Sequence, residues 1–386
     1  MLTALRQYAK TDRQLEILEA IISAGSHRKA AKLLGIHPRN IEKSIARVKA
    51  IASMQGWSPE HDLTHPVAPG QRLSGASTLY RRGEAEPVLQ WVKSSRDDDA
   101  AQQILIDFAN SLGESVKGLA PITPKPKDNN ADLLCIYPMG DPHFGMYAWA
   151  KDAGNDFDLT IAERLTKGAI DRLVNSSPPA STALLLNLGD MFHADNQQNT
   201  SKSGHQLDVD GRWAKVQQIG LMCMIYCIQR LLEKHRKVMV RINKGNHDGQ
   251  SSYALAMMLS CYFHNEKRVE IDLSPAVCWY YQFGQVLIGS THGDTIKGPA
   301  MVGLMAADKP SEWGTSKHRY WYVGHVHHQD SKEYPGGIVE YFRTLAARDA
   351  WHAGQGYRAG RDMRLIVMHK EHGEVERHRV DIGMLE

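Results

Sequence analysis

Short apolar runs, each followed within a few residues by a polar turn, recur five times between residues 131 and 330 of this 386-residue chain. They have the length of buried strands and occupy Leu133–Tyr137, Ala183–Leu188, Val238–Ile242, Val286–Gly289 and Tyr320–Val323. Helical stretches intervene, notably at Thr160–Asn175 and Trp213–His235. This alternation predicts an α/β core whose functional residues lie just past the strand ends.

The five polar turns carry aspartate, asparagine and histidine. They are Asp141-Pro142-His143, Gly189-Asp190, Gly245-Asn246-His247-Asp248, His292-Gly293-Asp294 and Gly324-His325-Val326-His327. An isolated Asp-x-His or Gly-Asp usually has only a structural role, but five such turns at successive strand ends favour a shared site. The mixed oxygen and nitrogen donors predict two divalent ions, with Mn preferred and Fe, Zn or Ni as alternatives.

In this order the five turns resemble the motifs of the calcineurin-like metallophosphoesterases, over roughly residues 131–330. The resemblance implies a two-sheet α/β sandwich flanked by helices, with a dinuclear metal site at one edge. It implies that one ion is held by Asp141, His143, Asp190 and His327, and the other by Asp190, Asn246, His292 and His325. By the same resemblance, His247 protonates the leaving oxygen and Asp248 orients His247. A hydroxide that bridges the metals is implied to attack phosphorus.

One part of the chain departs from the family pattern. An acidic residue often follows the second motif closely, but here the chain continues Met191-Phe192-His193. His193 either lines the site, contacts substrate or packs structurally. The polar segment Asn196–Trp213, which contains His205, either forms a substrate-contacting loop or is a plain surface connection. His193 and His205 are therefore candidate substrate contacts.

The first 56 residues are basic, with ten Lys/Arg against four Asp/Glu, in a chain whose net charge is only +3. Apolar spacing predicts helices over 12–24, 27–34 and 38–53, and the segment from Gly25 to Asn40 resembles helix-turn-helix domains. The third helix carries polar residues suited to DNA contacts, namely Arg39, Asn40, Lys43, Ser44 and Arg47. The alternative is a small helical bundle with a solvated basic face, or a protein-docking module.

Three parts are predicted along the chain. They are a helix-turn-helix domain over 1–56, a linker over 57–130, and a metallophosphoesterase catalytic domain over 131–386. The linker is expected to contain a hairpin (71–80 with 87–94) and a helix over 97–117. Strands after residue 340, such as Met363–His369, are expected to complete the second sheet.

The remaining features point to an intracellular protein. No stretch approaches about 18 uncharged apolar residues, so no membrane span is expected, and the N-terminus lacks the apolar core of a signal peptide. The five cysteines form no paired framework and are expected to be reduced. We expect a cytoplasmic protein, and chains that join these two modules also resemble those encoded by phages and mobile elements.

A phosphoesterase tethered to a DNA-reading module is most simply a nuclease, and the pattern resembles the DNA-repair exonuclease branch of the superfamily. We therefore predict a dinuclear phosphodiesterase that acts on DNA. The alternatives are a phosphomonoesterase or small-nucleotide phosphodiesterase and, in a different class, a DNA-binding regulator with a non-catalytic phosphoesterase fold. The oligomeric state is left open, with a homodimer among the options.

Overall fold

The computed structural model describes residues 2–59, 63–64, 67, 71–80, 87–96, 117–196, 198–200 and 206–385. The chain divides into two compact units, Met1–Ile104 and Leu105–Glu386. The finer division, with boundaries after residues 56 and 130, stays a prediction.

The first unit contains the three predicted helices, which are confirmed as α1 (Asp12–Ala24), α2 (His27–Leu33) and α3 (Pro38–Met54), after a 3₁₀ helix η1 (Leu2–Tyr8). The hydroxyls of Thr11 and Ser26 accept hydrogen bonds from the backbone N–H groups of Gln14 and Lys29, and so cap α1 and α2. Gly25 has a φ of 70°, which lets the chain turn sharply between these helices. The core of this unit is apolar and includes Leu18, Ile21, Ala30, Ile41, Ile45 and Val48.

Two small antiparallel pairs follow the helices. Strand β1 (Trp57–Ser58) pairs with β2 (Leu63–Thr64). Strand β3 (Gln71–Tyr80) pairs with β4 (Pro87–Arg96), which confirms the predicted hairpin. The helix predicted over 97–117 falls almost wholly outside the described residues.

The second unit is built on two sheets. The first has six strands in the order β15-β14-β5-β6-β7-β8. They are β5 (Asn130–Met139), β6 (Ala180–Asn187), β7 (Lys237–Ile242), β8 (Val269–Ile271), β14 (Asp362–His369) and β15 (Gly373–Asp381). Strands β5 to β8 are parallel, whereas β14 runs antiparallel to β5.

The expectation that Met363–His369 completes the second sheet is wrong. Strand β14 pairs with β5 in the first sheet, with Ile366 opposite Ile136. Leu365, Ile366 and Val367 are all fully buried, so both faces of β14 are covered. A strand that is buried on both faces lies in the interior of a covered sheet. Strand β15 forms the edge of this sheet, next to β14.

The second sheet has five strands in the order β12-β13-β11-β10-β9. They are β9 (Trp279–Phe283), β10 (Val286–Thr291), β11 (His318–Val323), β12 (Asp330–Tyr334) and β13 (Gly337–Tyr341). Strands β10, β11 and β13 are parallel, while β9 and β12 run antiparallel at the edges.

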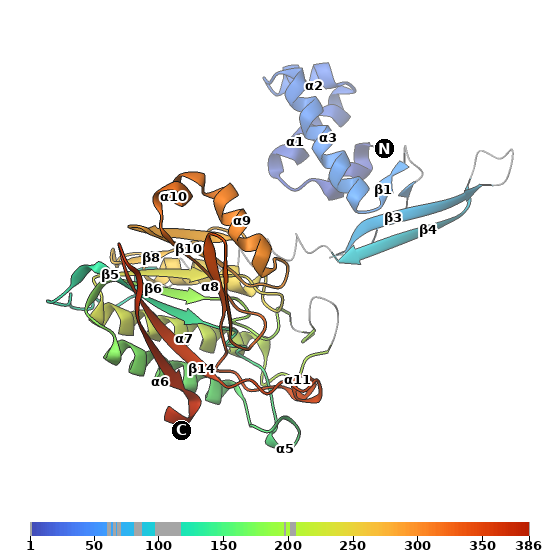
Figure 1. The fold of residues 1–386 in the computed structure, drawn as a ribbon. Coiled ribbons are helices and arrows are strands. Elements are labelled where there is room, and N and C mark those ends of the chain that lie inside the picture. The colour runs from blue at the N-terminus through green and yellow to red at the C-terminus, as the bar shows by residue number, and fades with distance from the viewer. Residues whose placement is uncertain are drawn as a thin grey trace. The chain divides into compact units, whose positions relative to one another are not determined.

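Alternation along the strands divides the core into layers (Figure 1). On β5, Leu134 and Ile136 pack between the sheets, whereas Cys135 and Tyr137 pack towards the helices. The helices on that side are α6 (Leu159–Ser176), α7 (Trp213–Lys234) and α8 (Ser251–Tyr262). Helix α9 (Gly298–Asp308), followed by α10 (Pro310–Thr315), covers the second sheet. The predicted α/β fold with two sheets flanked by helices is confirmed.

Among the described residues, no helix has the length and apolar character needed to cross a bilayer. The five cysteines are free thiols, and Cys223 and Cys227 are buried on α7.

The layer between the sheets makes a prediction about stability. Replacing Ile288 of β10, which is fully buried between the sheets, with alanine should lower the free energy of unfolding by about 2–5 kcal/mol, since the cavity cannot collapse fully. Urea denaturation measures this. Val375→Ala, at an exposed position of β15, is the matched control and should change little. Equal stability of the two variants would contradict the assigned layer.

Candidate metal centre

The two sheets bring the five polar turns to one place. Strands β5, β6 and β7 are parallel, so the turns that follow them lie at the same edge. Strands β10 and β11 are also parallel, and their turns reach this edge from the second sheet. Hydrogen bonds connect the turns of the two sheets: the backbone N–H of His325 donates to both carboxylate oxygens of Asp141 at 3.0 Å.

Two groups of side chains each have ligand atoms within 4.8 Å of one another: Asp141 with His143 and His327, and Asp190 with His292 and His325. In the first group, Nε2 of His143 lies 3.1 Å from Nε2 of His327. In the second, Nε2 of His292 lies 3.2 Å from Oδ2 of Asp190 and 3.0 Å from Oδ1 of Asn246. All seven predicted ligands therefore meet at this edge.

Asp190 lies between the two groups. Its Oδ2, which is close to His292, is also 4.0 Å from Nε2 of His143 in the other group. One carboxylate thus approaches ligands of both groups, which is what a residue shared by two ions must do.

The backbone of these ligands is strained. Positive φ angles occur at Asp141 (39°), His143 (47°), Asp190 (48°), His325 (71°) and His327 (55°). Among the described residues, Asn199 is the only other non-glycine residue with a positive φ. Such conformations cost about 1–3 kcal/mol each and cluster at functional sites. Their concentration here favours a ligand site over ordinary packing.

Glycine is required in two of the turns because the chain passes so close to a ligand. A Cβ on Gly245 would lie 1.8 Å from Oδ1 of Asp190, and one on Gly189 would lie 2.4 Å from Nδ1 of His292. The Gly-Asp and Gly-Asn motifs therefore have a steric reason, since only glycine allows these approaches.

The buried carboxylates need positive charge beside them. Burial raises the pKa of Asp141 to about 7, although His292 opposes this. Burial also acts against ionised Asp190, but attraction to His292 outweighs it and holds the pKa of Asp190 below its usual value. Burial disfavours the charged form of His292, yet Asp190 and Asp141 together raise its pKa to about 10. A divalent cation would supply this compensating charge in place of the His292 proton.

Burial favours the neutral form of four histidines of the site. Burial lowers the pKa of His327 and of His193 to about 3. Burial also lowers the pKa of His143 and of His325. A neutral imidazole keeps a lone pair free, so these side chains are in the form that binds metal.

Backbone carbonyls orient two of the rings. Nδ1 of His292 donates to the carbonyl oxygen of Leu188 at 2.9 Å, and Nδ1 of His247 donates to that of His193 at 2.8 Å. Each ring therefore presents Nε2 to a ligand or a substrate. This is the arrangement expected of His292 as a ligand and of His247 as a proton donor.

Asp248, expected from the sequence to orient His247, contacts the backbone of the loop that carries His247. The buried Asp248 carboxylate accepts hydrogen bonds from the backbone N–H groups of Gly245 and Phe192, at 2.8 and 3.2 Å. It acts on the backbone of the loop because two N–H groups there need an acceptor, while the carbonyl of His193 holds the ring.

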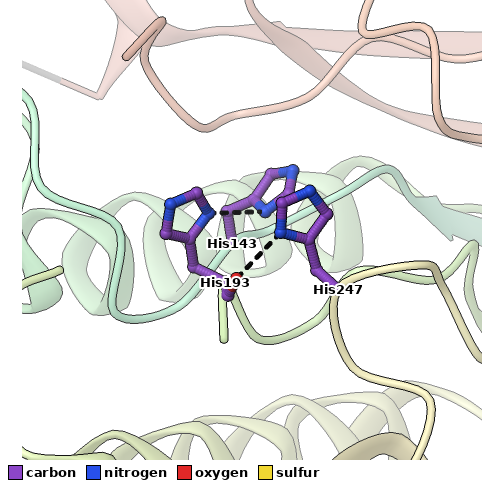
Figure 2. A group of neighbouring side chains, drawn as sticks. All are labelled: His143, His193 and His247. Carbon is purple, nitrogen blue, oxygen red and sulfur yellow. Dashed lines mark hydrogen bonds between the residues drawn. The ribbon is translucent and has the colours of Figure 1, made fainter. Parts of the chain in front are cut away.

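His193 lies against a metal-ligand candidate. Its Nδ1 is 3.2 Å from Nδ1 of His143, and its ring stacks on that of His247 with centroids 5.2 Å apart. Figure 2 shows the three rings together. His143, His193 and His247 also form a third group with ligand atoms within 4.8 Å. His193 thus lines the site, while His205, the other candidate substrate contact, lies outside the described residues.

Two residues near the site, His352 and Asp349, lie outside the five polar turns. The ring of His352 stacks on that of His327, with centroids 5.1 Å apart, and Nδ1 of His352 is 2.7 Å from Oδ1 of Asp349. They belong to the short helix α11 (Ala350–Gly354) and its N-cap. Neither follows an apolar run, so the strand-end pattern could not find them.

The five candidate DNA contacts lie apart from this centre in sequence, on α3. Arg39, Asn40, Lys43 and Arg47 are exposed, and Ser44 is half-buried. The opposite side of α3 carries the buried side chains of Ile41, Ile45, Val48 and Ala52. The helix therefore presents a polar, mainly basic face to solvent.

No protein-family model matches the chain, and no curated protein matches it. Solved structures similar to part of the chain include Vps29 with Zn²⁺ from Entamoeba histolytica, at 13% identity over 64% of this chain and 98% of that one, with a TM-score of 0.28. A conserved predicted phosphoesterase from Streptococcus pneumoniae TIGR4 has 11% identity over 64% and 98%, with a TM-score of 0.27. Vacuolar protein sorting 29 from Cryptosporidium parvum has 12% identity over 65% and 97%, with a TM-score of 0.30.

The donor set, the strained ligand backbone and the buried carboxylates fit a pair of divalent cations. Asp190→Asn keeps the size of the side chain but removes the charge that both groups share. It should reduce the metal bound per chain from two ions to one or none, as measured by elemental analysis after dialysis against Mn²⁺. Asp128→Asn, at an exposed position, is the control and should retain both ions. Two ions in the Asp190 variant would contradict the shared-ligand role.

Proposed function

We propose that this chain is a dinuclear metal-dependent phosphoesterase and that its substrate is DNA. The supporting observation is the meeting of seven candidate ligands from five strand-end turns, with Asp190 between the two groups. Bound divalent cations would neutralise phosphate oxygens and lower the pKa of water so that it becomes a nucleophile. The mixed donor set favours Mn, with Fe, Zn and Ni as alternatives.

The protein's own residues then have separate tasks. One ion would be held by Asp141, His143, Asp190 and His327, and the other by Asp190, Asn246, His292 and His325. His247 would donate a proton from Nε2 to the departing oxygen, since its Nδ1 is already committed to the carbonyl of His193. Asp248 supports this role indirectly by holding the loop before His247.

The acid role of His247 leads to a test with three substrates. Purified protein with Mn²⁺ should cleave duplex or single-stranded DNA as well as bis-p-nitrophenyl phosphate. With DNA as substrate, His247→Ala should keep both ions yet lose about 10²–10⁴-fold in kcat, because a basic alkoxide departs without a proton. Hydrolysis of bis-p-nitrophenyl phosphate should fall less, because p-nitrophenolate is a stable anion that leaves without a proton. His264→Ala, an exposed histidine on the same unit, serves as the control.

Each outcome of this test has a clear meaning. Cleavage of the small ester without any DNA cleavage would reject the nuclease, and would favour a phosphomonoesterase or a small-nucleotide phosphodiesterase. No hydrolysis of any ester with Mn, Fe, Zn or Ni would favour a DNA-binding regulator with a non-catalytic fold. Unchanged turnover of DNA by His247→Ala would show that His247 is not the general acid.

The basic face of α3 supports DNA as the substrate. Arg39 and Arg47 are exposed there, on a helix whose opposite side is buried. Exposed arginines of this kind neutralise phosphates and release counterions on binding. This face would hold or orient DNA, while cleavage occurs at the metal centre.

Substituting both Arg39 and Arg47 by alanine tests this role. If each neutralises one phosphate, the slope of log affinity against log salt should become shallower by about two. Fluorescence anisotropy of a labelled duplex at several salt concentrations measures the slope. Arg13→Ala on α1, where the arginine pairs with Glu16, is the control. An unchanged slope in the double variant would mean that this face of α3 does not contact DNA.

A further inference from the structure

We propose that residues 348–358, with the neighbouring helix α5 (Ala150–Ala153), form a platform on which an unpaired nucleobase stacks beside the metal centre. We call this surface the aromatic platform. The inference rests on the proposed function, because it identifies the part of a DNA substrate that lies next to the phosphate being cleaved.

Large aromatic rings are left in solvent at this surface. Trp351 is 61% exposed, Trp149 is 47% exposed, and Tyr357 is 39% exposed. Trp149 immediately precedes α5 and Trp351 lies in α11, and these two helices contact each other (Figure 1). Grouped apolar surface of this kind on a folded unit marks a binding site.

A continuous series of rings connects the platform to the metal centre. The ring of His352 stacks on the candidate ligand His327, with centroids 5.1 Å apart. The ring of His352 also contacts the rings of Trp351 and Tyr357 edge to face, with centroids 5.0 and 5.1 Å apart. The side chain of His352 is only 22% exposed, so it fills the space between the centre and the surface. A group bound on Trp351 therefore lies close to the metal ligands.

The geometry of this segment is fixed by its own hydrogen bonds. Asp349 caps α11 by accepting from the backbone N–H of His352, and the same carboxylate oxygen is 2.7 Å from Nδ1 of that residue. Arg348 and Arg358 both donate to the carbonyl oxygen of Tyr357, at 2.9 and 2.7 Å. The rings are thus held in place before any ligand arrives, which reduces the entropy lost on binding.

Positive charge among the rings indicates the class of ligand. Lys151 lies over the ring of Trp149, with Nζ 5.0 Å from its centroid, and Arg348 and Arg358 flank Tyr357. Two nearby acids have partners, because Asp349 contacts His352 and Asp156 accepts a hydrogen bond from the backbone N–H of Ala150. Asp152 remains as an exposed acid on α5. Aromatic faces interleaved with cations suit the bases and phosphates of a single strand. A base within a duplex is already covered on both faces, so the ligand is an unpaired or terminal base.

Two small diesters test the platform in the full chain. Thymidine 5′-(p-nitrophenyl phosphate) and methyl p-nitrophenyl phosphate share the same leaving group and differ in the nucleoside. With Mn²⁺, Trp351→Ala should raise KM for the thymidine ester about tenfold, within the range found when a stacking ring is removed, and leave the methyl ester unchanged. Trp351→Phe should stay close to the unsubstituted chain. Met222→Ala, at an exposed apolar position of α7, is the control.

A second measurement does not depend on turnover. In EDTA, a tetranucleotide that contains 2-aminopurine should lose fluorescence when its base stacks on the unsubstituted chain. Trp351→Ala should weaken this binding about tenfold, and Trp351→Phe should restore it. Circular dichroism checks that the variants are folded.

The outcomes separate the platform from the proposed function. If both esters lose activity equally in Trp351→Ala, the tryptophan only supports the metal centre and the platform is overturned. The platform is also overturned if KM and quenching are both unchanged, as expected for a surface that binds a protein partner. If the unsubstituted chain hydrolyses neither ester with Mn, Fe, Zn or Ni, the proposed function fails, and the quenching in EDTA still decides whether the platform binds a base.

Discussion

The burial of Asp141 and Asp190 among the histidines of the metal centre is the constraint on which the rest of this structure depends. A carboxylate removed from water is costly unless positive charge lies beside it. A proton on His292 supplies this positive charge, since Asp190 and Asp141 raise the pKa of His292 to about 10. Burial lowers the pKa of His143 and of His327, so these imidazoles keep their lone pairs. Cations bound between the two carboxylates and the neutral imidazoles would compensate the buried negative charge.

Rigid packing around the centre is needed to hold ligands in strained conformations. Five candidate ligands have left-handed backbones, and such strain persists only where the surrounding structure over-determines it. The apolar layer between the sheets supplies this rigidity, because Leu134, Leu186 and Ile288 are fully buried just before the turns begin. The glycines belong to the same argument, since Gly245 passes closer to Asp190 than any side chain would permit. The core and the site therefore depend on each other, because the sheets fix where the turns meet and the glycines allow the turns to pass close to the ligands.

Most of this could be predicted from the sequence because each strand-end turn carries its own local signal. The apolar runs, the helices Leu159–Ser176 and Trp213–Lys234, and the meeting of the seven ligands follow from spacing and parallel pairing. The sheet that β14 joins could not be predicted, because strand pairing depends on distant partners. The same holds for Asp248, whose partners are backbone N–H groups fixed only in the folded loop. His352 was missed for another reason: its position beside His327 comes from a short helix near the C-terminus, with no periodic pattern to indicate it.

The two binding surfaces proposed for this chain recognise nucleic acid by different physics. Phosphate contacts from the exposed arginines of α3 would depend strongly on salt and would be indifferent to base pairing. Stacking on Trp351 and its neighbours would depend little on salt but would require a base that is free of its own stack. A chain with both would bind duplex through the first unit and accept at the metal centre only the strand segment that has come apart. Under this proposal, local melting rather than affinity for duplex would select where cleavage occurs.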